Sequence, residues 1–518
     1  MKNLLIYIFI MLFGMSVSAQ CEDFSRADKS EYLDADFFFY QARFAEANSI
    51  LLGLHKTYPK NPEVSFRLAV CQIETSGDKE LATDILNLLL QSGNKESLFH
   101  LGKLAHLNYK FIEAISFYNE YANIEDRKLS DQVIKRHIKI AELAQELTNK
   151  PEDVLVKNLG AEVNSKFAEY IPVITPDETE MYFTSRRENS TGGRLDPNKE
   201  FFEDIYYTKK LNGVWSEPTN NISDINTPTH DATAAIAADG NAMVIYRTNR
   251  QLTGGDLYIT KKLNDKWTEP KILDENINSE FQEASACFSP DGETIIFSSN
   301  RPDGYGGKDL YRVKLLPNGE WSLPKNLGPS INTEYNEDSP FLDIDGRTLY
   351  FASEGHNGMG GFDIFVTQKV GEEHWKIPEN LGFPANSVED DIYLSITPGG
   401  RKGYYSSVKE DGYGGQDLYE IDFIYRQKTN LIIKGWLVDG NGSPVHGEIT
   451  IIDEKNKELQ GVYKSNKISG KYLLVLHPLV NYKMIVASGD KEVITKDLFF
   501  EFPDENNAEI NLQEIVLN

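Results

Sequence analysis

Apolar residues recur at intervals of three and four from about Ser30 to Leu147, in a segment rich in Ala, Leu and Glu. That spacing predicts amphipathic helices. Beyond residue 151 the pattern changes to short runs of β-forming residues, separated by glycine, proline, Asn and Asp. Such runs predict strands joined by tight turns. We therefore expect a multidomain chain that is helical first and all-β afterwards.

Small residues recur within the helical segment. Ala47, Ala82 and Ala114 are 35 and 32 residues apart, and Gly102 lies twelve residues before Ala114. This spacing resembles that of tetratricopeptide repeats. Small residues let paired helices approach closely, so such units stack into an α-solenoid with a concave groove. The sequence therefore predicts a tetratricopeptide-repeat domain over residues 28–150.

Grooves of this kind bind extended segments of other proteins. Counting from Gly102, Val70 and Ala35 as equivalent positions places eight side chains on the groove face. These candidate partner-binding residues are Tyr32, Asp36, Phe39, Tyr40, Arg67, Glu74, Lys103 and His106. The alternative is that the aromatic residues among them pack against the β domain that follows.

The β part of the chain contains a repeat. Asp, then Ile or Leu, then an aromatic residue occur five times, at steps of 52, 53, 54 and 54 residues. The first residues of these motifs are Asp204, Asp256, Asp309, Asp363 and Asp417. A double glycine precedes each of the last four, and a Trp-x-x-Pro follows each of the first four. A fixed period of this size predicts one supersecondary unit used repeatedly, as in a propeller blade.

Each unit is predicted to hold four short strands. In the third unit they fall within residues 284–292, 294–301, 309–316 and 320–328, with Asp-Gly and Gly-Gly pairs at the turns. Glycine adopts the positive φ that tight hairpins need. Four antiparallel strands per repeat, arranged radially, form a β-propeller.

The ends of the repeat predict the number of blades. The fifth unit lacks the Trp-Pro strand, whereas residues 152–165, before the first unit, resemble an orphan fourth strand. We predict five blades over residues 151–425, closed by pairing of residues 154–158 with the last blade. A ring closed in this way has no exposed strand edge.

The tail, residues 430–518, alternates in period two with frequent turn residues, which predicts a small β-sandwich. Eight positions resemble the carboxypeptidase regulatory-like domain, a transthyretin-like module: Gly435, Val438, Asp439, Pro444, Gly470, Tyr472, Pro478 and Tyr482. The resemblance implies no peptidase activity, because the sequence has no counterpart of the zinc-binding catalytic domain of that family.

The first nineteen residues combine Lys2, an apolar run and Ser18-Ala19, the layout of a secretory signal peptide. We predict cleavage after Ala19. Cys21 raises the alternative of a lipoprotein, but Gln20 stands where a lipoprotein signal requires a small residue. No later segment reaches the roughly 20 apolar residues of a membrane helix.

Charge limits the partners. The chain has 79 acidic and 53 basic residues and a net charge of -26, which repels nucleic acid and anionic lipid and favours basic or neutral protein partners. Three cysteines cannot form a disulfide framework, so Cys71 and Cys287 are predicted to be buried thiols.

One set of residues has the composition of an active site. An acid follows five residues after a recurring Asn: Glu169, Asp231, Glu283, Glu337 and Asp391. Five-bladed propellers can be glycosidases, but a glycosidase needs two unequal carboxylates. An acid at the same register in every unit favours a hydrogen-bonding or turn-capping role. The alternative non-catalytic use is a cation or basic-partner site at the channel mouth.

Other catalytic patterns are missing from the sequence. It contains no HExxH, no GxSxG, no phosphate loop and no paired-Cys motif. We therefore predict no catalytic residue, no metal site and no cofactor. The Asp of each repeated motif is expected to accept backbone N–H bonds from its own loop.

The third unit, residues 288–333, is similar to the PD40 subclass of WD40-like repeats. The order of signal peptide, helical array, PD40 propeller and regulatory-like sandwich resembles the OmpA-family envelope proteins typified by PorE of the type IX secretion system. Those relatives usually continue into an OmpA-like domain that binds peptidoglycan. In the given sequence the sandwich is the last module, which leaves three alternatives: wall anchoring was lost, was passed to a separate peptidoglycan-binding partner, or never belonged to this branch.

These observations predict a non-enzymatic periplasmic scaffold associated with outer-membrane machinery. The resemblance implies partners among outer-membrane or periplasmic proteins of a secretion or gliding complex. The competing prediction is an envelope hydrolase that uses the propeller to act on glycan or peptide.

Overall fold

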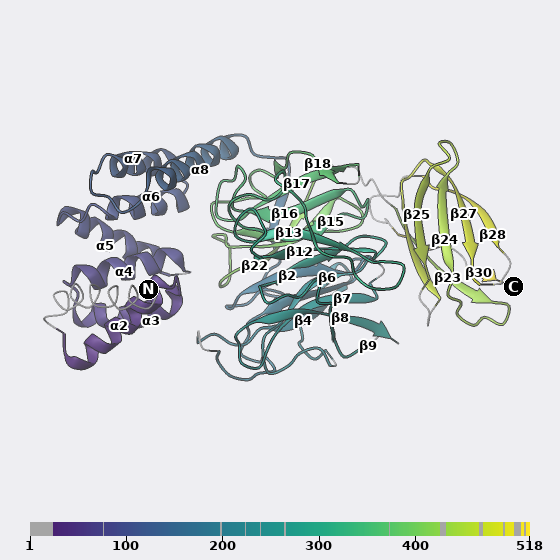
Figure 1. Ribbon diagram of the computed structural model, residues 1–518, viewed down its shortest axis with the longest axis horizontal. Coiled ribbons are helices and arrows are strands. Elements are labelled where there is room, and N and C mark those ends of the chain that lie inside the picture. Colours follow the sequence, from purple (N-terminus) through teal and green to yellow (C-terminus); the bar gives the residue numbers. More distant parts are fainter. Residues whose placement is uncertain are drawn as a thin grey trace. The chain divides into compact units, whose positions relative to one another are not determined.

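The computed structural model describes residues 24–75, 77–196, 199–222, 224–238, 240–263, 266–371, 373–424, 431–465, 470–489, 493–501, 509–511 and 514–517. The chain divides near residue 145 into two compact units, a helical one and a mainly β one. Figure 1 shows the helices of the first unit and the strands of the second. The predicted signal peptide and Cys21 lie outside the described residues.

The first unit is a series of helices. They are α2 (Arg26–Tyr40), α3 (Phe44–Thr57), α4 (Pro62–Glu74), α5 (Lys79–Gln91), α6 (Ser97–Leu107), α7 (Phe111–Ala122) and α8 (Asp131–Asn149), the last of which runs past the division. Ser25, Asn61 and Asp78 cap α2, α4 and α5 by accepting bonds from the first N–H groups of each helix. From α2 to α7, each helix packs against the next.

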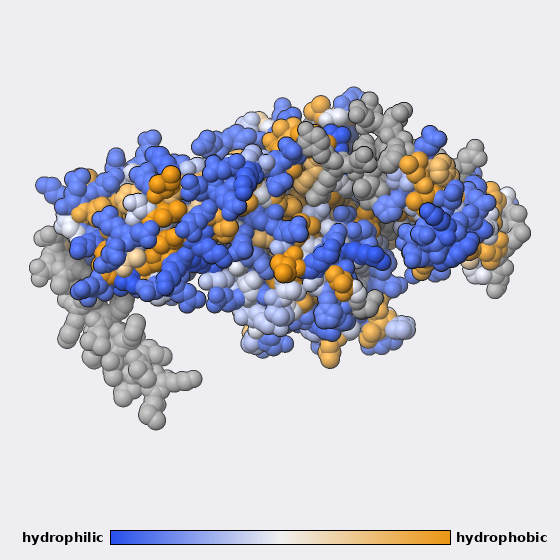
Figure 2. Space-filling view, turned by 90° about the horizontal axis from the view of Figure 1, so that it is seen from above, coloured by the Kyte–Doolittle hydropathy of each residue, from blue (hydrophilic) through white to orange (hydrophobic). Residues whose placement is uncertain are grey.

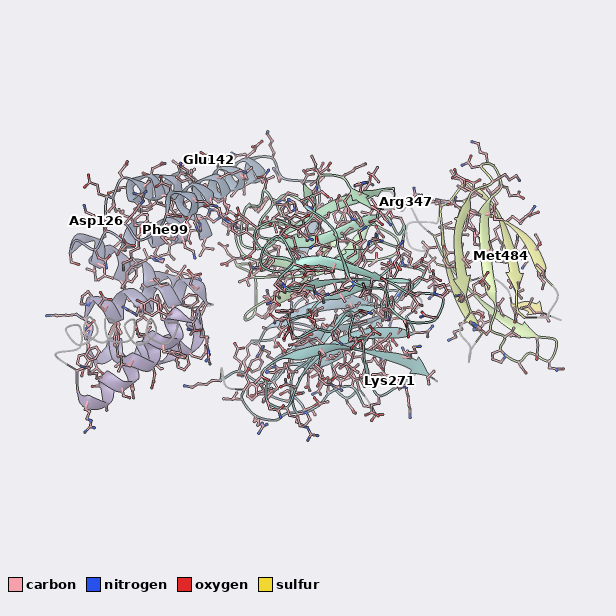
Figure 3. All side chains as sticks on the ribbon, in the orientation of Figure 1. Phe99, Asp126, Glu142, Lys271, Arg347 and Met484 are labelled. Carbon is pink, nitrogen blue, oxygen red and sulfur yellow. The ribbon has the colours of Figure 1, made fainter. Side chains whose placement is uncertain are left out.

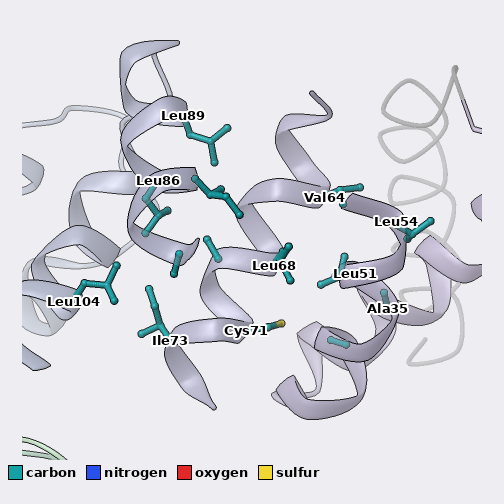
Figure 4. Close-up of a cluster of buried hydrophobic side chains, with 14 of the residues drawn as sticks. Ala35, Leu51, Leu54, Val64, Leu68, Cys71, Ile73, Leu86, Leu89 and Leu104 are labelled. Carbon is teal, nitrogen blue, oxygen red and sulfur yellow. The ribbon is translucent and has the colours of Figure 1, made fainter. Parts of the chain in front are cut away.

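Small and branched side chains fill the space between these helices. Leu51, Leu68, Cys71 and Leu86 form part of one buried cluster (Figure 4). A Cβ atom on Gly102 would lie 2.5 Å from the Tyr118 ring, so α6 and α7 can approach this closely only with glycine there. The small residues that mark the sequence period therefore serve helix packing.

The second unit begins with consecutive antiparallel sheets. The first contains β2 (Glu169–Ile174), β3 (Glu180–Ser185), β4 (Asp204–Leu211) and β5 (Val214–Trp215). The second contains β6 (Asp231–Ile236), β7 (Ala242–Thr248), β8 (Gly255–Leu263), β9 (Lys266–Trp267) and β10 (Lys271–Ile272). The third contains β11 (Ala286–Phe288), β12 (Thr294–Ser299), β13 (Asp309–Lys314) and β14 (Lys325–Asn326).

Two further sheets complete the series. One contains β15 (Glu337–Leu342), β16 (Thr348–Ser353), β17 (Asp363–Val370), β18 (His374–Trp375) and β19 (Glu379–Asn380). The other joins β20 (Asp391–Ile396), β21 (Lys402–Ser407) and β22 (Asp417–Asp422) to β1 (Leu155–Asn158). The first strands contact one another in the order β2, β6, β11, β15, β20 and back to β2. This closed ring is the arrangement of a β-propeller.

The ring closes through a strand from the other end of the β region. β1 pairs antiparallel with β22, with Leu155 opposite Asp422 and Asn158 opposite Tyr419. The pairing of this segment with the last sheet, which the sequence predicts, is present. Residues more than 250 positions apart in the chain therefore share one sheet.

The tail contains two sheets with a shared core. One joins β23 (Leu431–Asp439), β26 (Lys471–Leu476), β29 (Glu509–Asn511) and β30 (Ile515–Leu517), and the other joins β24 (Glu448–Asp453), β25 (Leu459–Lys464), β27 (Asn481–Ala487) and β28 (Ile494–Phe499). Met484 is fully buried in the core of the tail (Figure 3). The Tyr482 hydroxyl accepts a bond from His477 N and donates one to His477 O, which ties β27 to the turn before it.

The surface seen in Figure 2 is predominantly hydrophilic, with apolar residues in scattered patches. Within the described part of the chain, no helix is both long enough and apolar enough to span a bilayer. Cys71 and Cys287 are buried free thiols, as the sequence predicts.

Closure by β1 can be tested with two shortened chains. A chain that begins at Glu152 keeps β1, whereas one that begins at Ala161 loses it and leaves β22 as a free edge. Because a free edge strand pairs with other chains, we expect the longer chain to be a soluble monomer and the shorter one to aggregate and unfold at lower temperature. Size-exclusion chromatography and thermal unfolding measure both. Equal heat stability of two monomeric chains would show that β1 does not close the ring.

Candidate functional site

The recurring acids lie at the inner start of each sheet and are buried. Glu169, Asp231, Glu337 and Asp391 begin β2, β6, β15 and β20, Glu283 precedes β11, and all five are at most 1% exposed. Each accepts bonds from the loop before its own sheet. Glu337, for example, accepts the N–H and hydroxyl of Thr333, both at 2.7 Å, and the hydroxyl of Ser353 at 2.7 Å.

Most of these acids also have a cationic partner. Arg187 lies 3.2 Å from Glu169, Arg301 lies 3.2 Å from Glu283, and Arg247 and Lys409 pair with Asp231 and Asp391 at 2.5 and 3.2 Å. In the fourth sheet His356 takes the corresponding place, 2.8 Å from the Ile331 carbonyl. Burial raises the pKa of Glu169, Asp231 and Glu337. These acids are thus committed to bonds within their own sheets and loops.

The Asn that precedes each acid fastens neighbouring sheets together. Asn332 accepts the N–H of Leu310 at 2.8 Å and donates to its carbonyl at 3.0 Å, so it satisfies both backbone groups of one residue in β13. Four other residues make the same pair of bonds to the third strand of the preceding sheet: Asn164, Asn226, Asn278 and Asn386. Asn164 reaches Leu418 in β22, across the closure of the ring.

The Asp of the repeated motif orders the loop before it. Asp309 accepts the N–H of Tyr305 at 2.7 Å and the Asn326 amide at 2.7 Å. At the closure, Asn158 of β1 donates to Asp417 at 2.8 Å and so takes the role of Asn326. Asp256 differs in this second bond: Ile272 of β10 occupies the position that Asn326 has in β14, and an Ile side chain cannot donate a hydrogen bond to Asp256. Apart from Asp256, the motif acids therefore have the loop-capping role that the sequence predicts.

The residues beside these structural positions do not repeat. The residues just before the five acids are Ala168, His230, Gln282, Asn336 and Asp390, and those just after are Tyr170, Ala232, Ala284, Asp338 and Ile392. Several of them line a cavity of 390 Å³ that we call the mouth of the ring. The mouth is lined by Tyr170, Lys308, Asn336, Asp338, Phe362, Asp390, Ile392, Tyr393 and Gln416.

A charged network adjoins the mouth at the first sheet. Arg186 donates to Tyr170 at 3.2 Å and to Glu203 at 2.8 Å, and it pairs with Asp196 at 3.2 Å. His230 lies 3.2 Å from Glu203 and 3.5 Å from Asp196. Burial raises the pKa of Glu203, but His230 and Arg186 outweigh it and lower that pKa to about 2. Glu203 is therefore an ionised, fully paired carboxylate.

Two acids of the mouth have different surroundings. Asp338 pairs with Lys308 at 2.9 Å and accepts the Ser285 hydroxyl, and these contacts outweigh burial and lower its pKa. Asp390 accepts only the Phe362 N–H among the hydrogen bonds found, at 2.8 Å, and within the described residues it has no salt bridge. Loss of hydration and the nearby carboxylates of Asp391 and Glu354 raise its pKa.

The predicted groove residues all lie on alternate helices, α2, α4 and α6, of the helical unit. Five of them form one cluster around Arg67, which donates to Asp36 at 2.7 Å and lies over the rings of Tyr32, Phe39 and Tyr40 at 5.6 to 5.7 Å. Tyr32, Asp36 and Arg67 are buried, whereas Tyr40 is 59% exposed.

The other three predicted groove residues lie away from that cluster. Lys103 and Glu74 form an ion pair between α6 and α4. His106 is buried, with its ring 5.3 Å from the Phe111 ring. The predicted groove residues therefore combine a buried cluster around Arg67 with exposed aromatic surface at Tyr40.

Sequence reasoning missed the residues of the mouth. At the mouth, the repeat does not mark the functional positions: the other four units have different residues at the positions equivalent to Tyr170, Lys308, Asp390 and Tyr393. The signal that could have found them is the alignment of the five units with one another, in which these columns differ while the neighbouring columns agree. Within the described residues no group of three His, Cys, Asp or Glu side chains is arranged to hold a metal ion.

No family model matches the chain, and no curated protein matches it. Among solved structures, TolB from Acinetobacter baumannii is 14% identical, with coverage of 57% of this chain and 71% of that one and a TM-score of 0.32. A glycoside hydrolase is 8% identical, with 58% and 97% coverage and a TM-score of 0.39. An endo-arabinase from Bacteroides thetaiotaomicron is 14% identical, with 53% and 99% coverage and a TM-score of 0.34. All three TM-scores lie below 0.5, so we infer neither fold nor function from these similarities.

The motif acid of the fourth sheet predicts a pH dependence. Asp363 is fully buried, and burial raises its pKa to about 7 despite the N–H bonds that it accepts from Gly360 and Met359. Between pH about 4 and 7 the Asp363 carboxyl is therefore protonated in the folded chain, whereas in the unfolded chain, where its pKa is about 3.9, it has lost the proton. Its contribution to stability is therefore fully present below pH about 4 and is lost as the pH rises to about 7.

The Asp363→Asn variant should remove this dependence. Asn keeps an acceptor oxygen but does not titrate, so we expect the free energy of unfolding of the variant, relative to that of the parent, to rise between pH 4 and 7 and then level off. Urea unfolding at a series of pH values measures the difference. A difference that stays constant over this range would contradict the assignment.

Proposed function

We propose that this protein is a non-enzymatic periplasmic scaffold associated with outer-membrane machinery. One observation carries the proposal: the recurring acids that follow each Asn, a set with the composition of an active site, are buried and bonded to their own loops. A general acid or nucleophile must instead reach a substrate. A carboxylate that caps a turn in every sheet instead stabilises the loops of the ring.

We also propose an assignment for each of the three modules: the helices form a tetratricopeptide-type solenoid, the ring has five blades, and the tail is a transthyretin-like sandwich. Helix packing at Gly102, the ring order of the first strands and the two-sheet core of the tail support these assignments. Stacked helical repeats form extended concave binding surfaces in other proteins.

We further propose that the partners are outer-membrane or periplasmic proteins. The order of modules is similar to that of OmpA-family components of type IX secretion or gliding machinery. A separate peptidoglycan-binding partner would supply wall anchoring in such a complex. The net charge of -26 favours basic or neutral surfaces on these partners.

One observation favours the alternative, an envelope hydrolase. Asp338 and Asp390 both line the mouth, and their surroundings shift their pKa values in opposite directions. Unequal carboxylates in one cavity are what acid–base hydrolysis of a glycosidic bond requires. Turnover of a glycan by the purified protein, abolished in both Asp338→Asn and Asp390→Asn, would establish that function.

Cross-linking in native envelope followed by pulldown of the full chain tests the scaffold function. We expect recovery of specific envelope proteins and no glycan turnover. Tyr40→Ala should reduce recovery severalfold, because Tyr40 is the most exposed aromatic residue of the predicted groove face. Ile112→Ala is the matched control, since Ile112 is 73% exposed on α7, a helix that carries none of the predicted groove residues. Recovery of the bait alone, together with turnover of a glycan, would overturn the proposal.

A further inference from the structure

The mouth of the ring combines an acid without a cationic partner with aromatic side chains. Elsewhere in the ring, four of the five recurring acids are paired with Arg or Lys. At the mouth, Lys308 is already paired with Asp338. Asp390 is exposed to solvent within the mouth, although the surrounding protein removes part of its hydration, and within the described residues it lacks a salt bridge. The carboxylate of Asp390 is therefore available to a cation from outside.

Aromatic rings stand in the same cavity. Tyr170 and Tyr393 are stacked with ring centroids 6.3 Å apart, and Phe362 also lines the cavity. Aromatic faces attract cations and cover the apolar stems of Lys and Arg side chains. The volume of 390 Å³ is within the usual range of binding pockets, about 300–1,000 Å³.

The chain already uses this combination internally. Arg301 pairs with Glu283 and lies 5.2 and 5.0 Å from the ring centroids of Phe297 and Tyr311. Lys409 pairs with Asp391 and lies over Tyr405 and Tyr419 at 5.7 and 5.8 Å. Each internal site joins one carboxylate, two aromatic rings and one cation. The mouth has the Asp390 carboxylate and the rings, but its Lys308 is paired with Asp338, and among the described residues no cation is paired with Asp390.

We propose that the mouth of the ring binds a Lys or Arg side chain of a partner protein, with its cation at Asp390 and its stem against Tyr170 and Tyr393. The inference rests on the proposed scaffold function, because it supposes that a protein surface approaches the ring. The acidic excess of the chain would also attract a basic partner from a distance.

The test is a titration of the full chain with two short peptides. Acetyl-Gly-Arg-Gly-amide carries the cation, and acetyl-Gly-citrulline-Gly-amide is its uncharged isostere. We expect the arginine peptide to bind about tenfold more tightly at low salt, since hydrogen bonds to charged groups are the stronger ones. Calorimetry or ligand-observed NMR measures both peptides.

Two variants with the same change of net charge locate the site. Asp390→Asn keeps an oxygen for the Phe362 N–H but removes the charge, and should abolish most of the preference for arginine. Glu280→Gln changes an exposed acid in the corresponding loop of the third sheet and should leave the preference intact. Equal binding of the two peptides, binding of neither, or an unchanged preference in Asp390→Asn would overturn the proposal.

The titration is independent of the envelope pulldown. If the pulldown recovers partners but the titration shows no preference for arginine, the scaffold function stands and the partners bind elsewhere. If the titration succeeds but the pulldown recovers only the bait, the mouth binds cations and the scaffold function fails.

Discussion

Neighbouring sheets of the ring are fastened by an asparagine side chain that bonds both backbone groups of one residue in the preceding sheet. Asn332 does this to Leu310, and Asn164 does it to Leu418 across the closure. These bonds are buried, and leaving either backbone group unpaired there would cost about 1–3 kcal/mol. Neighbouring sheets also approach closely at three of the double-glycine loops: a Cβ atom on Gly306, Gly360 or Gly414 would lie 2.4 to 2.5 Å from the backbone of the next loop.

This fastening separates the residues that hold the ring from those that are free to vary. Thr333 bonds to Glu337, and Asn326 bonds to both Asp309 and Asn332. The other sheets have residues in the same roles, except at Asp256, where Ile272 replaces the Asn. The residues beside them are under no such constraint. The proposed cation site lies among those unrepeated positions.

The sequence predicted the ring well because the fold depends on repeated residues. A single sequence displays the regular spacing of the motif acids and of the Asn in each loop. It also shows the orphan strand at Asn158, which lies before the first unit. The pairing of β1 with β22 follows from that signal. Spacing predicted groove residues that lie on α2, α4 and α6, but spacing could not show that Arg67 is buried among Tyr32, Asp36 and Phe39.

The mouth could not be predicted, because its residues occur once each and come from several sheets. Tyr170 and Tyr393 are more than 220 positions apart in the chain, and only closure of the ring brings their rings together. Closure is thus the condition for the site as well as for the fold.

Hydrogen exchange of residues 417–422 tests closure most directly. These residues form β22, which pairs with β21 on one side. Its other edge is covered only if β1 pairs with it, and Asn164 bonds both backbone groups of Leu418 in this strand. We expect their amides to exchange as slowly as those of residues 309–314 in β13, and we expect Asn164→Ala to speed exchange in β22 while β13 stays protected. Fast exchange of β22 in the unaltered chain would contradict closure of the ring by β1.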